Sequence, residues 1–179
     1  MQTRVWLSLI GALVLFSTAS AQVKFDACSL ITRAEIEAVQ GEPVIDTKSS
    51  EPDRPMFAVS QCFYTVTTFS KSVSLELTRK DPEKPAKEGP RDQWKKLFHP
   101  AADKEVEGDR EKEGEKESAP PRRVKGVGDE AFWMGTAITG ALYVLKGDAY
   151  LRISIGGGES ESVRIQKIKT LARKALTRL

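Results

Sequence analysis

The first hydrophobic feature of the chain is an apolar run at residues 5–16, which follows a single positive charge at Arg4. Small residues come next and end at Ala21, as signal peptidase requires. Twelve apolar residues make about 18 Å of helix, short of the roughly 30 Å hydrocarbon core of a membrane. The pattern predicts a signal peptide over residues 1–21 that is cleaved after Ala21. The alternative is an uncleaved anchor.

A short helix is predicted after this leader. Thr32 and Glu35 have the spacing of a capping box, and Ile31 and Ile36 take the two positions of a hydrophobic staple. Gly41 supplies the stop signal. A helix of about two turns is stable only when it packs on something else, so we expect it to dock on a sheet.

Three strand-like segments follow, at residues 44–47, 57–67 and 72–79. The first is weak. The second is rich in aromatic and β-branched residues, and the third alternates apolar and polar positions. Alternation predicts a sheet with one face packed against helices and the other face wet.

The second half of the chain contains further predicted elements. Residues 93–99 have helical spacing, residues 142–145 and 150–155 form a predicted hairpin, and residues 162–179 have the apolar stripe of a long helix. The predicted order is α-β-β-β-(α)-β-β-β-α. We therefore expect an α+β fold, in which an antiparallel sheet packs on one face against a short N-terminal and a long C-terminal helix.

Charged residues are concentrated in one stretch of the chain. The chain has 28 Lys plus Arg and 25 Asp plus Glu, a net charge of +3 that does not indicate a nucleic-acid-binding protein. Residues 103–123 are dense in charge and poor in apolar residues, so a disordered loop is predicted there. Acidic residues occupy every odd position from 103 to 117, which imitates part of a calcium loop. Position 114 is Gly, where such a loop needs Glu, so a solvated linker is the better interpretation.

The chain has two cysteines, Cys28 and Cys62, both after the predicted cleavage site. In an exported protein such a pair predicts a structural disulfide, which closes a separation of 34 residues and stabilises by about 4 kcal/mol in the chain-entropy model. A redox or metal role is the alternative. It is disfavoured because the two cysteines are far apart in sequence and the chain has a single His.

The chain resembles a family of small exported bacterial domains that have no established activity and are often lipoproteins. The segments that carry the resemblance are residues 26–43, 61–64, 126–132 and 142–155. The resemblance implies a PsbP/Mog1-like α/β/α sandwich and a Cys28–Cys62 bridge, and it implies no catalytic residue. The residues before Cys28 lack a lipobox, so lipid anchoring is not expected.

Candidate catalytic residues are few. His99 stands at a helix end without a nucleophile motif, and packing or exposure is the expected role. Asp129 and Glu130 precede two aromatic residues, which permits a hydrolase as an alternative function. Adjacent strand residues point to opposite faces, which weakens that alternative. We expect no cofactor, no metal site and no catalytic residue.

The leading hypothesis is a monomeric, non-enzymatic domain, periplasmic or secreted, that binds an envelope protein or a small ligand. Its expected contact surface is the sheet face opposite the helices, with Tyr64, Trp133, Tyr143 and Tyr150 as candidates. A passive envelope protein kept soluble by its charged loop is a further alternative. No transmembrane segment is predicted in the mature chain.

Overall fold

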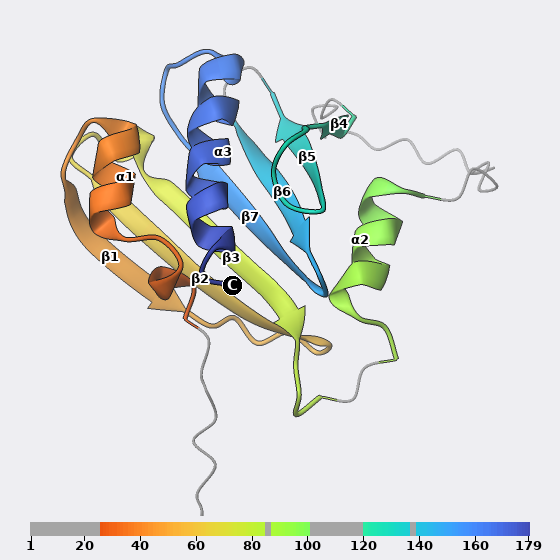
Figure 1. Ribbon diagram of the computed structural model, residues 1–179. Helices are drawn as coiled ribbons and strands as arrows, with labels where there is room; N and C mark the ends of the chain where they lie inside the picture. Colours follow the sequence, from red (N-terminus) through yellow and green to blue (C-terminus); the bar gives the residue numbers. More distant parts are fainter. Residues whose placement is uncertain (1–25, 85–86, 101–119, 137–138) are drawn as a thin grey trace, which may run out of the picture.

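The computed structural model describes residues 26–84, 87–100, 120–136 and 139–179 (Figure 1). The strands are β1 (Val44–Ser50), β2 (Phe57–Val66), β3 (Val73–Lys80), β4 (Arg122–Arg123), β5 (Glu130–Gly135), β6 (Gly140–Lys146) and β7 (Ala149–Ile155). The helices are α1 (Arg33–Gln40), α2 (Pro90–Phe98) and α3 (Glu161–Leu176), with the 3₁₀ turns η1 (Ala27–Ser29) and η2 (Phe69–Lys71). These elements form the predicted α+β fold.

The strands described make one antiparallel sheet in the order β1-β2-β3-β7-β6-β5-β4. Register follows the alternation seen in the sequence, since Cys62 pairs with Leu75 and Leu75 with Ile153. These side chains point to the same face and are buried. This face carries the main core of the molecule.

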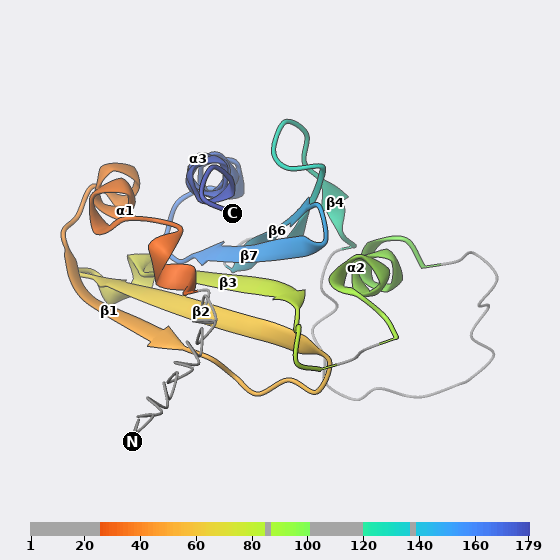
Figure 2. The same cartoon turned by 60° about the horizontal axis from the view of Figure 1, so that its bottom comes forward.

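α1 and α3 cover this face of the sheet (Figure 2). α1 begins with the predicted capping box, in which the Glu35 amide donates to Thr32 Oγ1 and the Thr32 amide donates to Glu35 Oε2. Gly41 ends it in the left-handed conformation with φ of 72°. Both helices are therefore where the sequence placed them, and α3 ends at Leu176, three residues before the terminus.

The expectation that the helices share one face is wrong for α2. Trp94 and Phe98 of α2 pack with Phe132, Leu145 and Tyr150, which alternate with the main-core residues of β5, β6 and β7 and point to the opposite side. The reason is that this half of the sheet is apolar on both faces, so both faces must pack against other elements. The molecule thus has a second, smaller, aromatic core.

Two predicted segments lie outside the described residues: the signal peptide over residues 1–21 and the charged stretch over residues 101–119. The predicted loop over 103–123 extends too far, because Arg122 and Arg123 form β4 and pair with Trp133 and Phe132. None of the helices among the described residues is long and apolar enough to cross a membrane.

Candidate functional site

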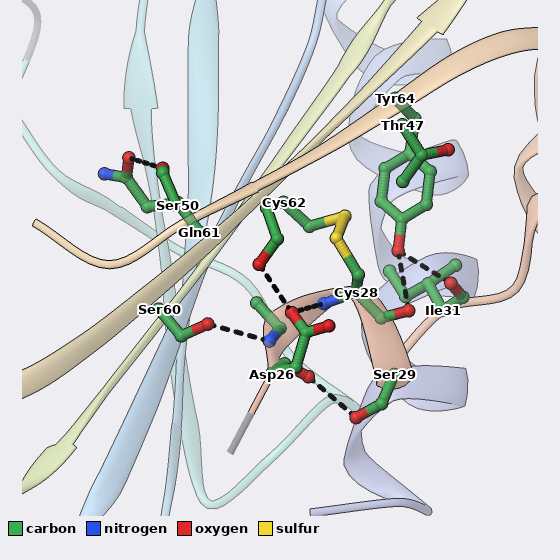
Figure 3. The surroundings of a disulfide bond; sticks show 12 residues. Asp26, Cys28, Ser29, Ile31, Thr47, Ser50, Ser60, Gln61, Cys62 and Tyr64 are labelled. Carbon is green, nitrogen blue, oxygen red and sulfur yellow. Dashed lines mark hydrogen bonds between the residues drawn. A yellow bond between two sulfur atoms is a disulfide. The ribbon is translucent and has the colours of Figure 1, made fainter. Parts of the chain in front are cut away.

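The Cys28–Cys62 disulfide is present and ties η1 to the middle of β2 (Figure 3). Asp26 organises the turn, because its Oδ1 atom accepts from the Cys28 amide at 2.9 Å and from Ser49 Oγ of β1 at 2.8 Å. Ser60 Oγ accepts from the Ala27 amide at 2.9 Å. These contacts make the bridge part of a packed structural junction, which confirms the predicted pairing.

The four aromatic residues proposed as a contact surface do not share a surface. Tyr64 and Trp133 are 1% and 2% exposed in the main core, and Tyr150 is 6% exposed beneath α2. Tyr143 is half-buried on the α2 side, where its ring lies 5.4 Å from that of Phe98. The predicted set is therefore wrong as a set, because β-strand alternation distributes these rings over both faces.

Glu130 and His99 are brought together by the docking of α2. The His99 Nε2 and Glu130 Oε2 atoms lie 2.7 Å apart, and Trp94 Nε1 donates to the same oxygen at 2.8 Å. Arg123 Nη2 lies 3.5 Å from Glu130 Oε1. Glu130 thus joins the end of α2 to β5, and its carboxylate is surrounded by donors.

Asp129 lies in the bend that precedes β5 and has a different set of partners. Its Oδ2 atom accepts from the Gly147 amide at 2.8 Å and lies 3.5 Å from Arg91 Nη2, and its Oδ1 atom lies 3.4 Å from Lys146 Nζ. The carboxylate closes the β6–β7 turn against the loop before β5. Asp129 and Glu130 therefore have separate partners and separate structural roles.

The pKa values of these carboxyls do not suit a general acid. Partial burial raises the pKa of Glu130, but hydrogen bonds from His99 and Trp94 outweigh it and leave the pKa below its ordinary value. The Gly147 amide, followed by Lys146, lowers the pKa of Asp129. A glycosidase-type acid needs the opposite shift and a second carboxyl across a cleft. Within the described residues, no group of three or more His, Cys, Asp or Glu side chains could hold a metal ion.

A groove of about 560 Å³ lies at the end of the sheet where β2 begins and β3 ends. Ala58, Ser60, Leu77 and Arg79 form its floor on the face that also carries Cys62. Its walls are the β1–β2 loop and the segment after β3. The lining consists of Glu51, Pro52, Asp53, Phe57, Ala58, Val59, Ser60, Leu77, Arg79, Asp81, Pro82, Glu83 and Lys84.

An ion pair joins the two walls. Lys84 Nζ donates to Asp53 Oδ1 at 2.8 Å and to the Arg54 carbonyl at 3.0 Å, and it lies 3.7 Å from Asp81 Oδ2. Hydrogen bonding to Lys84 lowers the pKa of Asp53, and the same bond raises the pKa of Lys84. The lining as a whole has four carboxylates and two cations, so it carries a formal excess of negative charge.

This groove was not predicted from the sequence. Its residues come from two segments, 51–60 and 77–84, that the antiparallel β2–β3 pairing places at one sheet end. The available signal was the clustering of Pro and acidic residues on both flanks of the predicted β2–β3 hairpin. A hairpin brings the start of its first strand beside the end of its second, so the two clusters could have been placed together.

The chain was compared with protein-family models, curated proteins and solved structures, and nothing matches. The resemblance to small exported domains therefore stays a proposal. The groove and its chemistry have to carry the functional argument alone.

Proposed function

We propose that the protein is a non-enzymatic binding domain that holds an extended, basic and apolar segment of a partner protein in the groove at the start of β2 and the end of β3. The groove itself is the observation that carries the proposal. Its volume of about 560 Å³ falls in the range of roughly 300–1,000 Å³ that ligand sites occupy.

The lining supports this class of ligand. Pro52, Ala58 and Pro82 offer accessible apolar surface, while Asp53 and Glu83 add negative charge at the walls. The residues that the structure describes carry 22 basic and 17 acidic side chains, so the groove is a negative site on a positive molecule. A locally negative cleft concentrates cationic ligands and speeds their association, an effect that weakens with salt.

The test uses two fluorescent heptapeptides, one alternating lysine with leucine and one alternating glutamate with leucine. Fluorescence anisotropy should show saturable binding of the lysine peptide, and the affinity should fall as salt rises. Ala58→Trp fills the floor of the groove and should abolish that binding. Equal binding of both peptides contradicts the proposal.

Ala34→Trp is the matched control, because Ala34 lies exposed on α1 and away from the groove. This variant should bind like the wild type. If Ala58→Trp disturbs folding, Glu51→Gln with Glu83→Gln provides a second route, since both side chains line the wall and are exposed. Unchanged peptide binding in the folded groove variants refutes the proposal.

The proposed location is outside the cytoplasm, after cleavage following Ala21. The apolar run at residues 5–16 and the Cys28–Cys62 bridge support it, because disulfides persist in oxidising compartments. Amino-terminal sequencing of the protein recovered from its native host should begin at Gln22. A start at Met1 contradicts cleavage and favours the uncleaved anchor.

A further inference from the structure

A second charged site lies beside α3, at the loop between β4 and β5, which rises on the side of the sheet that α3 covers (Figure 2). Arg173 of α3 donates from Nε and Nη2 to the Gly126 carbonyl at 3.2 and 3.0 Å. A methyl group placed on Gly126 would stand 3.7 Å from Arg173 Nη2 and 4.0 Å from Lys169 Nζ. Two cationic side chains therefore lie close to Gly126, next to the exposed Lys125.

The loop that receives these cations is fixed in place. Val127 is buried, and the Asp129 amide donates to the Leu145 carbonyl at 2.8 Å. At Gly128 the backbone has φ of 62° and packs so closely on β6 that a Cβ would lie 2.5 Å from the Leu145 carbonyl oxygen. The position of the Gly126 carbonyl, and with it the Arg173 guanidinium, is thus set before any ligand arrives. Such preorganisation lowers the cost of binding.

No carboxylate neutralises this cluster among the residues that the structure describes. Lys125, Lys169 and Arg173 take part in none of the described ion pairs. The carboxylates beside the loop are engaged elsewhere, Asp129 by Gly147 and Glu130 by His99 and Trp94. Like charges four residues apart on a helix repel, so Lys169 and Arg173 gain from an anion between them.

Residues 123–131 of this loop, which include Lys125 and the engaged carboxylates Asp129 and Glu130, line a recess of about 230 Å³. Arg173 still has the Nη1 group for which no partner is described, and Lys169 has an ammonium with three donors. A tetrahedral oxyanion matches this combination of one fixed guanidinium and one flexible ammonium, because each of its oxygens can accept a charge-assisted hydrogen bond. We propose that Lys169, Arg173 and Lys125 form a binding site for a phosphate group.

The chemistry is the same whether the phosphate is free or belongs to a lipid headgroup, so the experiment has two arms. In the first, inorganic phosphate is titrated into the full mature chain while NMR follows the amides of Gly126, Val127 and Gly128. In the second, sedimentation measures binding to phosphatidylcholine vesicles with and without phosphatidylglycerol. Saturable shifts in the first arm support the site. Binding to the anionic vesicles with the same variant pattern assigns the phosphate to a lipid.

Lys169→Gln is the main variant, because Lys169 holds no backbone atom of the loop. It should weaken phosphate binding about tenfold, the usual worth of one charge-assisted hydrogen bond. Arg173→Gln should weaken it at least as much. The matched control is Lys174→Gln, since Lys174 lies exposed on the same helix and has no described contact with the loop.

Two results would overturn the proposal. One is the absence of phosphate-dependent shifts at Gly126–Gly128 in the wild type. The other is an equal loss of binding in Lys174→Gln and Lys169→Gln, which would show a general attraction to the charge of α3. Neither result bears on the groove at the start of β2 and the end of β3, whose peptide assay is independent.

Discussion

At the scale of single residues, polar atoms that the fold buries have specific structural roles. Tyr64 is an aromatic residue of the main core, yet its hydroxyl donates to the Ile31 carbonyl at 2.6 Å. Burial also raises the pKa of this phenol above its ordinary value, so it remains a neutral donor in the physiological range. The ring fills the core while the hydroxyl fixes the approach to α1. This structural role explains why Tyr64 is unavailable as a contact residue.

Tyr64→Phe tests that role. The substitution keeps the ring but leaves the Ile31 carbonyl without its hydroxyl donor, so we expect the free energy of unfolding to fall by about 1–2 kcal/mol. Urea denaturation measures it. Tyr143→Phe is the control, because the Tyr143 hydroxyl accepts from Arg152 Nε at 3.2 Å on a half-exposed face. A larger loss in the control than in Tyr64→Phe would contradict the assignment.

Glu35 is a carboxyl group whose pKa the fold lowers strongly. Arg178 donates to both of its oxygens at 2.8 Å, and the Thr32 amide donates to Oε2 at 2.9 Å. The hydrogen bonds from Arg178, opposed by partial burial and aided by Thr32, lower the pKa of Glu35 from 4.5 to about 2. A carboxyl with a lowered folded-state pKa stabilises the fold above its unfolded pKa. That stability is lost as pH falls through the folded pKa.

At pH 7 the free energy of unfolding of Glu35→Gln should therefore be about 1 kcal/mol lower than that of the wild type. This is the scale of a well-formed surface ion pair. The difference should shrink as pH falls from about 4.5 towards 2, the window that the pKa shift of Glu35 defines. Denaturation curves of both proteins across this range measure it. A difference that stays constant down to pH 2 would show that the charge of Glu35 is not what stabilises the junction with Arg178.

At the scale of elements, the accuracy of the sequence prediction depended on how local each signal was. The capping box of α1 and the alternation of β3 lie within a few residues, and both were found. β1 was predicted only over 44–47 but extends to Ser50, because pairing with β2 stabilises a polar segment that has little strand propensity of its own. The face of the sheet on which α2 packs was missed, since it depends on residues 34 or more positions away along the chain.

α2 is attached through its aromatic side chains, which makes it a separable unit of stability. Trp94 is 1% exposed, and its ring lies 4.3 Å from that of Phe98 and 6.0 Å from that of Phe132. Trp94→Ala should destabilise the packing of α2 on the sheet by about 3–5 kcal/mol. We expect hydrogen exchange in α2 to accelerate strongly while exchange in α3, which packs on the other face, stays slow.

Leu97→Ala provides the control, because Leu97 is an exposed position on the same helix and should change stability by less than about 0.5 kcal/mol. Mass spectrometry of exchanged peptides separates the two helices. If Trp94→Ala accelerated exchange equally in α2 and α3, the two cores would form one cooperative unit, and the second core could not be regarded as independent.

At the scale of the whole molecule, the two candidate sites have opposite charge. The groove at the start of β2 and the end of β3 has four carboxylates against two cations, whereas residues 162–179 of α3 and its tail contain six cations and no acid. The basic residues of the last helix can be read in the sequence, but only the fold brings Arg173 to the Gly126 carbonyl and Lys169 close to Gly126. Both sites join segments that are distant in sequence, and a single sequence carries no direct signal for such contacts.

The charged stretch between α2 and β4 allows a test of whether these residues contribute to the stability of the domain. Residues 101–119 carry eight acidic and four basic side chains and almost no apolar surface, so they contribute little that a core could bury. Replacing residues 103–119 with an equally long Gly-Ser segment should leave the melting temperature within about 2 °C of the wild type. Circular dichroism measures the change. The replacement spares Arg122 and Arg123, which pair with β5 as the edge strand of the sheet.

The same replacement also separates a passive role of the stretch from an active one. The peptide affinity of the groove and the phosphate shifts at Gly126 should both persist, because every residue proposed for either site lies outside positions 103–119. A fall in melting temperature of several degrees would show that the stretch contacts the domain. Loss of peptide or phosphate binding without loss of stability would assign the stretch a part in recognition, which the present proposals do not give it.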